Sequence, residues 1–330
     1  MRIRTLNQPT ALHDENALVS VRGCTYEASF RDHLLAVRWV RGGRQQVVFG
    51  ARSVALDDDT YLFVNEGRSY DVRFTNSTTM QSFAVYVRCG LAAQVFAGLR
   101  APADELDVEP TGDVVFDEHL HAHDSVVSPV LRFLERHVDV GTAEPAWFEE
   151  QVVFLLERMF RTQTDLARRE AAVGAAREAT RREIVRRVAL ARDYIHSCYE
   201  RPITLAHMGA AAALSPHHLL RLFKLVNGCT PREYLQAKRT RMAARLIAST
   251  DLTLEEIAHR VGFEDRSTLG RQLRRTFGVN PRQMRRASQS VSAAAPQPPR
   301  TQEGRASAPQ ASRQSKVRPQ SGAIRDALAE

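Results

Sequence analysis

Between Val261 and Arg286, the side chains that could do chemistry are hydroxyl and guanidinium groups repeated at helical spacing. On a helix, residues three and four apart share one face, so these groups point to one side and an apolar stripe occupies the other. A guanidinium can bond the edge of a guanine bidentately or pair with a phosphate, and hydroxyls add single hydrogen bonds. The chemistry indicated is recognition of an ordered polyanion. The members are Arg266, Ser267, Thr268, Arg271, Arg274 and Arg275, opposite Leu269, Leu273 and Phe277.

An altered copy of this unit lies about fifty residues closer to the N-terminus. Residues 204–224 align with residues 253–275, with one extra residue in the turn of the later copy, and residues 228–232 align with residues 278–282. Self-similarity over this length indicates a duplicated supersecondary unit. In the earlier copy the predicted exposed face carries His217, His218, Arg221 and Lys224, opposite Leu219, Leu222 and Phe223.

Each copy is predicted to fold as a helix, a tight turn and a second helix. In the later copy Thr253 and Glu256 have the spacing of a capping box, and Gly262 suits the left-handed residue that ends the first helix. A second helix with a basic, hydrogen-bonding outer face is typical of a helix-turn-helix, in which that helix enters the major groove of DNA.

The segment between the copies sets their spacing. Thr230 and Glu233 form another capping box, and the helix that they start is predicted to run to about Ser249. Some 20 helical residues span roughly 30 Å, close to the roughly 34 Å between successive major grooves on one face of B-DNA. The sequence therefore predicts that one chain reads double-stranded DNA in two adjacent grooves. The predicted base readers are His217, His218, Arg221, Ser267, Thr268 and Arg271, while Lys224, Arg274 and Arg275 are assigned to phosphates and Arg266 completes the DNA-binding set.

The charge distribution agrees with a binding rear half. Residues 184–330 hold 25 Lys and Arg against 11 Asp and Glu, a net +14, whereas residues 1–183 hold 21 against 27, a net −6. An acidic front joined to a basic rear is typical of a sensor attached to a polyanion binder, although a basic surface can also serve solubility alone.

The front half is predicted to be a β domain followed by helices. Residues 17–88 alternate apolar and polar side chains between turn signals, which indicates an antiparallel sandwich or barrel. A helical stripe covers residues 126–138, and a second helix is predicted over residues 145–169. Beyond Ser288 almost no large apolar side chains remain, which predicts a disordered tail.

At these residues the chain resembles the AraC/XylS family of transcriptional regulators. The resemblance covers residues 184–288 and is carried by IAHRVGFEDRSTLGRQLRRTFGVNPRQMR and by ARDYIHSCYERPITL, which is similar to the family's first helix. It implies a transcription regulator, an activator rather than a repressor, with RNA polymerase as a partner. It also implies a cupin-like β-barrel and a helical dimerisation segment ahead of the DNA-binding domain.

The chain departs from the family pattern at a few positions. Leu269, Leu273 and Met284 replace two Phe and a Tyr, and each swap keeps an apolar core residue. In the first unit Ala213 occupies the usual turn glycine, and Gly209 occupies the usual helix alanine. An alanine at positive φ and a glycine inside a helix, at roughly 0.5–1 kcal/mol, would both cost stability.

The predicted fold class is α+β with two domains. The boundaries are 1–110 for the β-rich, cupin-like sensor, 111–170 for the helical segment, 171–183 for a helical or flexible connector, 184–288 for the double helix-turn-helix, and 289–330 for the tail. Two features of the front half leave alternatives open. The stripe Phe148–Met159 is either a dimer seam, which the resemblance favours, or packs on the barrel. The strand aromatics either line a small-molecule effector pocket or form plain core: Trp39, Phe49, Tyr61, Phe63, Tyr70, Phe74 and Tyr86.

Metal binding and catalysis have little support in the sequence. His119, His121 and His123 alternate as on a strand, but the segment leads into a helical stripe, where only His119 and His123 would share a face. No P-loop, G-x-S-x-G or G-x-G-x-x-G is present. We therefore expect no catalytic residue, metal or cofactor.

Cysteine spacing and apolar patterning indicate the compartment. The four cysteines lie far apart, which favours buried thiols in a reducing cytoplasm, and no apolar run is long enough for a membrane helix. Two rival functions stay open: an architectural protein that binds DNA without sequence choice, and a β-barrel enzyme tethered to DNA.

Overall fold

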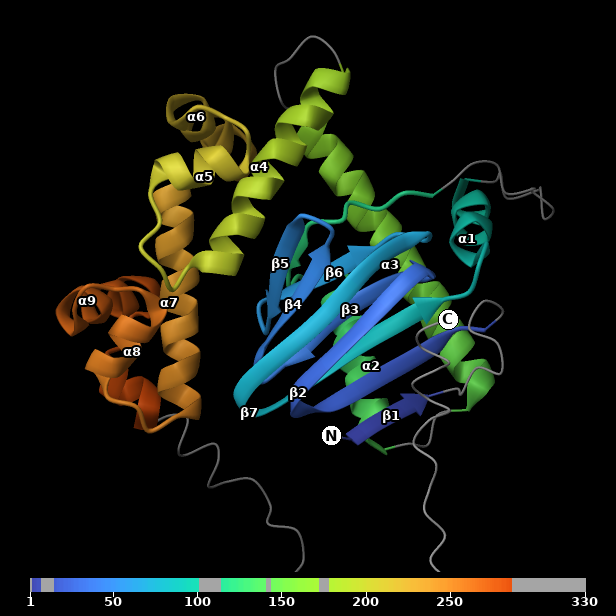
Figure 1. Ribbon diagram of the computed structural model, residues 1–330, viewed down its shortest axis with the longest axis horizontal. Helices are drawn as coiled ribbons and strands as arrows, with labels where there is room; N and C mark the ends of the chain where they lie inside the picture. The colour runs from blue at the N-terminus through green and yellow to red at the C-terminus, as the bar shows by residue number, and fades with distance from the viewer. Residues whose placement is uncertain (1, 7–14, 101–113, 141–143, 172–177, 287–330) are drawn as a thin grey trace, which may run out of the picture. The chain divides into compact units, whose positions relative to one another are not determined.

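The computed structural model describes residues 2–6, 15–100, 114–140, 144–171 and 178–286 (Figure 1). The front of the chain forms one antiparallel sheet, as its alternating pattern predicts. Its strands are β1 (Arg2–Leu6), β2 (Ala17–His33), β3 (Leu35–Arg41), β4 (Arg44–Phe49), β5 (Arg52–Asp57), β6 (Thr60–Val64), β7 (Arg68–Val87) and β8 (Leu120–Ala122).

The long strand β7 organises the sheet. The strands follow the order β1-β2-β7-β3-β6-β8, and β4 pairs with both β5 and β7. The C-terminal half of β7 pairs with β3, whereas Asp71–Arg73 near its start pair with β4. Its partner β2 shifts register between Gly23 and Thr25 and again between Phe30 and His33, which bends the strand. The sheet is thus a nearly closed antiparallel barrel, which confirms the predicted fold class.

Helices cover one face of this sheet. Helix α1 (Leu91–Arg100) follows β7, and α2 (Ser128–Val140) and α3 (Pro145–Ala171) lie along the sheet (Figure 1). Every residue of the predicted α3 stripe is buried there: Phe148, Val152, Leu155, Leu156 and Met159. The stripe therefore packs within the chain, and its interpretation as a dimer seam is wrong.

The strand aromatics divide between the two faces, because successive side chains on a strand alternate. Those facing the helices are Trp39, Tyr61 and Phe63. Those packed on the other face are Phe49, Tyr70, Phe74 and Tyr86. Since they belong to two clusters, they do not line one common pocket.

The rear of the described chain is helical. Its elements are α4 (Glu178–Cys198), α5 (Leu205–Ala211), α6 (Pro216–Asn227), α7 (Pro231–Ser249), α8 (Leu254–Val261) and α9 (Arg266–Phe277). The part of the predicted connector from Glu178 onward is helix, whereas residues 172–177 and the tail 289–330 lie outside the described residues. No helix in the described ranges is long and apolar enough to cross a membrane.

The contacts divide the chain into two compact units. The first holds the described residues up to Tyr199 together with Ile203–Tyr234. It therefore contains the barrel and its helices, α4, α5, α6 and the start of α7. Among the described residues, the second holds Glu200–Pro202 and the chain from Leu235 to Arg286, which includes α8 and α9. The two predicted helix-turn-helix copies thus lie in different units.

Candidate nucleic-acid interface

The first copy consists of α5 and α6, and local hydrogen bonds define its helix ends. The hydroxyl of Thr204 accepts a hydrogen bond from the backbone N–H of His207 at 3.2 Å, which caps α5. Ser215 caps α6 in the same way through the N–H of His218. Gly228 ends α6 in the left-handed conformation, with φ of 72°.

The turn between α5 and α6 contains the two departures noted in the sequence. Ala213 adopts φ of 51°, as its turn position requires. The N–H of Leu214 donates to the carbonyl of Gly209 at 2.8 Å, so the turn folds back closely over α5. A Cβ on Gly209 would lie 2.7 Å from the carbonyl oxygen of Leu214. Gly209 is therefore required by this close approach, and it accompanies the strained Ala213.

The second helix of this copy separates an exposed polar face from a buried apolar one. Leu219, Leu222 and Phe223 are buried, as predicted. The four side chains assigned to DNA are all exposed: His217, His218, Arg221 and Lys224. Since nothing within the described chain covers them, they are available to a large partner.

The second copy consists of α8 and α9. Thr253 and Glu256 form the predicted capping box, with N–H···O distances of 2.7 and 3.2 Å between them. Gly262 ends α8 with φ of 87°, and a Cβ there would lie 2.8 Å from the carbonyl oxygen of Glu200. Gly262 is therefore required both by its positive φ and by the close approach of the Glu200 carbonyl. The residue equivalent to Gly209 in this copy is the buried Ala258.

The start of α9 is a connected polar network. The carboxylate of Asp265 accepts from the backbone N–H of Thr268 at 2.7 Å and from its hydroxyl at 3.0 Å. These bonds, the backbone one above all, hold the pKa of Asp265 below its usual range. The Thr268 hydroxyl in turn accepts from Arg271 Nη2 at 3.0 Å. Thr268 thus orients Arg271 in addition to presenting its own hydroxyl.

The predicted faces of α9 are present with one correction. Leu269 and Leu273 are fully buried. Arg266, Ser267, Arg271, Arg274 and Arg275 are exposed, and Thr268 is half-buried at the edge. Phe277 was expected in the core, but it is 41% exposed. It is the last residue of α9, directly before Gly278, and follows the last buried leucine of the helix by four residues.

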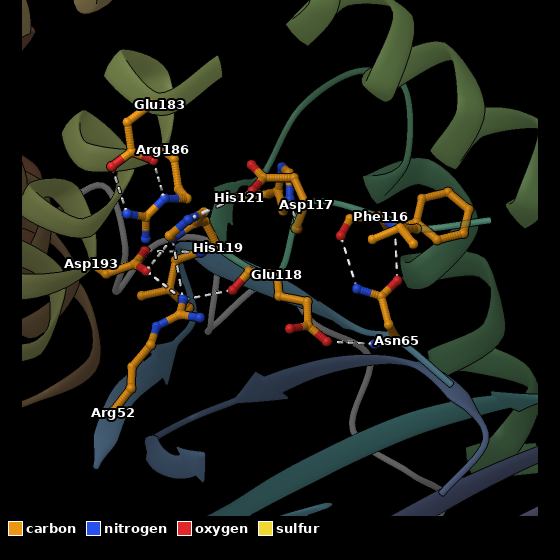
Figure 2. A network of polar contacts seen from close by, with 12 residues as sticks. Arg52, Asn65, Phe116, Asp117, Glu118, His119, His121, Glu183, Arg186 and Asp193 are labelled. Carbon is orange, nitrogen blue, oxygen red and sulfur yellow. Dashed lines mark hydrogen bonds and ion pairs between the residues drawn. The ribbon is translucent and has the colours of Figure 1, made fainter. Parts of the chain in front are cut away.

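Helix α4 carries the first copy and is tied to the barrel by a buried charge. Asp193 of α4 accepts from Arg52 Nη2 of β5 and pairs with Nδ1 of His119, both at 2.7 Å, and its other oxygen accepts from the N–H of Leu120 (Figure 2). Burial alone would raise the pKa of Asp193, but the bond with His119 and the charge of Arg52 outweigh it and hold the pKa at about 2. Near its middle α4 contacts the turn of the first copy, where Arg187 donates to the carbonyl of Ala213.

The histidine segment differs from its expected structure. It was assigned to a helix, but Leu120–Ala122 form strand β8, which pairs with β6. His119 meets Asp193, His121 bonds the carbonyl of Asp117 at 3.0 Å, and His123 bonds the Ser128 hydroxyl. Among the described residues no group of three or more His, Cys, Asp and Glu is arranged to hold a metal ion.

Helix α7 begins as predicted. The Thr230 N–H donates to Glu233 at 2.8 Å, and the Glu233 N–H donates to the Thr230 hydroxyl at 3.2 Å. Tyr234, in the first turn, packs edge-on against Phe223 of α6. The helix continues without interruption to Ser249.

Sequence reasoning missed two apolar residues of the α6 surface. Leu220 is 37% exposed and Leu225 is 54% exposed. A comparison of the copies at their offset of fifty would have found them, since the later copy has Gly270 and Arg275 at these positions.

Part of the chain is similar in sequence to known proteins. A family model described as a helix-turn-helix domain matches residues 208–287. The chain is 39% identical over 93 residues to the regulatory protein ada of Salmonella typhimurium, a match of 28% of this chain and 26% of that protein. It is 36% identical over 94 residues to an AraC-like transcription regulator of Streptomyces lividans, which covers 28% of this chain and 31% of that one.

A solved structure matches over the same part of the chain. The C-terminal domain of the two-component response regulator yesN from Fusobacterium nucleatum is 31% identical and covers 29% of this chain and 94% of that chain, with a TM-score of 0.28. The matches span only about a quarter to a third of the length of the first curated relatives. The family model, whose matched residues are 208–287, concerns the rear helices alone.

Proposed function

We propose that this chain, whose residues 208–287 carry an AraC-type helix-turn-helix domain, is a sequence-specific transcription regulator that inserts α6 and α9 into two major grooves. The observation that carries the proposal is the equivalence of the two helices. Each is capped at its start, ends at a left-handed glycine, buries two leucines on one face and exposes a row of basic and hydrogen-bonding side chains on the other. One such helix could be a basic surface, but two matched ones indicate two readers.

Within each reader we propose a division of labour. Arg221 and Arg271 are the exposed arginines nearest the middle of the two faces, and an arginine there can bond a guanine bidentately. His217, His218, Ser267 and Thr268 would add single base contacts, while Lys224, Arg266, Arg274 and Arg275 would contact phosphates.

We propose that the barrel is the sensor and that the chain has three functional parts. Residues 1–110 form the sensor, residues 111–170 the helical segment, and residues 184–288 the DNA-binding domain. A cavity of about 450 Å³ lies beside the β4–β5 and β6–β7 turns, which is a usual size for a small-molecule site. Arg52 lines this cavity and also bonds Asp193 of α4, so an effector bound there could change how α4 is held. Activation through RNA polymerase is proposed from the family resemblance, and pairing of two copies would have to use a surface other than the α3 stripe.

The test is selection of duplex DNA from a random pool by the full-length protein, with Arg221→Ala and Arg271→Ala beside it. Arg132→Ala, an exposed arginine of α2, is the matched control. We expect a two-part motif with half-elements about one helical turn apart. Each reader variant should lose its preference in one half and bind the cognate site about 1–3 kcal/mol more weakly, while the control matches the parent.

Other outcomes would support the rival functions. If no motif emerges and binding only falls with added salt, the protein binds DNA without sequence choice. If both arginine variants keep the full motif, the assignment of the readers is wrong even if the protein is selective.

A further inference from the structure

The α6 surface combines apolar and basic groups in a way that α9 does not. Leu220 is 37% exposed, whereas the leucines on the opposite side of α6 are buried. It lies three residues after His217 and four before Lys224, so both are its neighbours on the helix surface. Exposure of a leucine to water is unfavourable, and a leucine beside polar and basic side chains suits contact with an apolar group held within a polyanion.

Packing does not explain why α9 lacks an equivalent exposed leucine. The residue equivalent to Leu220 is Gly270, and a Cβ built there meets nothing within 4 Å. A side chain would therefore fit at this position of α9. The difference between the copies lies in what each surface presents outward.

DNA offers one apolar group in the major groove, the 5-methyl of thymine. We propose that Leu220 contacts the methyl group of a thymine in the half-site read by α6, and that the α9 half-site has no such requirement. This inference rests on the proposed insertion of α6 into the major groove. The partner is DNA rather than a protein because Arg221 and Lys224, beside the leucine, carry positive charge complementary to phosphates, and His217 adds a hydrogen-bonding side chain.

Position along the helix selects Leu220 over Leu225. Recognition helices contact base edges through their N-terminal residues. Leu220 is in the first half of α6 beside Arg221, whereas Leu225 is in the last turn. Leu225, which is 54% exposed, is therefore a matched control on the same helix.

The experiment measures binding of the full-length protein to its selected duplex after single thymines are replaced by deoxyuridine. This replacement removes only the methyl group and keeps base pairing. In the parent protein, one replacement in the α6 half should weaken binding about fourfold, the effect of about 0.8 kcal/mol for one buried methyl. In Leu220→Ala the same replacement should change affinity by less than about 1.5-fold, whereas Leu225→Ala should keep the parent's response.

Each result has a distinct meaning. The inference is overturned if no deoxyuridine weakens binding by the parent, or if Leu220→Ala keeps the full methyl response. Either result leaves the proposed function standing, because a selected duplex already exists. Failure to select any duplex would instead remove the proposed function and this inference together. A thermal melt of Leu220→Ala that matches the parent shows that the variant is folded.

Discussion

At two equivalent positions the copies have exchanged alanine and glycine. Ala213 is at the turn position that Gly262 occupies in the second copy, and Gly209 is at the helix position of Ala258. Ala213 holds φ of 51°, a conformation that costs an L-residue roughly 1–2 kcal/mol. Gly209 gives the turn room to approach α5. The strain at Ala213 is thus a feature of the native first copy, and it can be removed without touching any predicted DNA contact.

Ala213→Gly should therefore stabilise the protein. Relief of the left-handed strain exceeds the added flexibility of glycine in the unfolded chain, which leaves a net gain of about 1 kcal/mol. Urea unfolding followed by helical circular dichroism measures this gain. Gly209→Ala is the opposing control, because its Cβ would lie 2.7 Å from the Leu214 carbonyl oxygen, and it should destabilise. A loss of stability in Ala213→Gly would show that the alanine methyl makes a contact worth more than the strain.

The sequence could predict the strain at these residues but not how they fit together. The turn position of Ala213 followed from the resemblance to the family pattern, and its positive φ follows from that turn. The need for Gly209 depends on the path of Leu214 over α5, which no local pattern contains. The exposure of Phe277 was missed for the same reason, since helical spacing gives direction but not where packing ends.

At the scale of elements, the attachment of α4 to the barrel depends on one carboxylate. Asp193 is buried with His119 and bonds the half-buried Arg52, and its pKa is held at about 2. Because the folded pKa lies below the ordinary value of 3.8, this group stabilises the fold above about pH 4 and loses that contribution as the pH falls toward 2.

Asp193→Asn should destabilise the first unit by about 3 kcal/mol at pH 6, because it removes the buried carboxylate that Arg52 and His119 contact. The difference from the parent should shrink as the pH falls from 4 toward 2, since the parent's Asp193 then becomes protonated. Urea midpoints measured over this pH range test both statements. Asp71→Asn, which breaks an exposed pair with Arg31, is the control and should cost less than about 1 kcal/mol. If the difference in stability between the parent and Asp193→Asn stayed constant with pH, the low pKa of Asp193 would not contribute to stability as described.

Helices with a clear apolar periodicity could be predicted from the sequence, whereas the contact between α4 and the barrel could not. The α2 and α3 stripes and both recognition helices follow from side-chain spacing alone. Asp193 and Arg52 are separated by 141 residues, so only the fold brings them together. The histidine segment was assigned to a helix by its neighbours, but pairing of β8 with β6 decides its structure.

At the scale of the whole molecule, the two readers belong to different compact units and share α7. This helix has 19 residues with no glycine and no proline after its first position. It is about 28 Å long at 1.5 Å per residue, close to one turn of B-DNA. We propose that this continuous helix sets the separation of the two half-sites, whereas a flexible linker would let the readers find half-sites at many separations.

The spacing of the half-elements should therefore be fixed. Five extra base pairs would turn one half-element to the far side of the duplex, and ten would restore its face but add about 34 Å. Both duplexes should bind at least about a hundredfold more weakly than the selected site, because one reader loses its bases in each case. Fluorescence anisotropy with the full-length protein measures this, and a duplex with one half-element scrambled gives the affinity of a single reader. Binding of the ten-pair insertion at parental affinity would mean that α7 does not set the distance, and that the two units move independently on DNA.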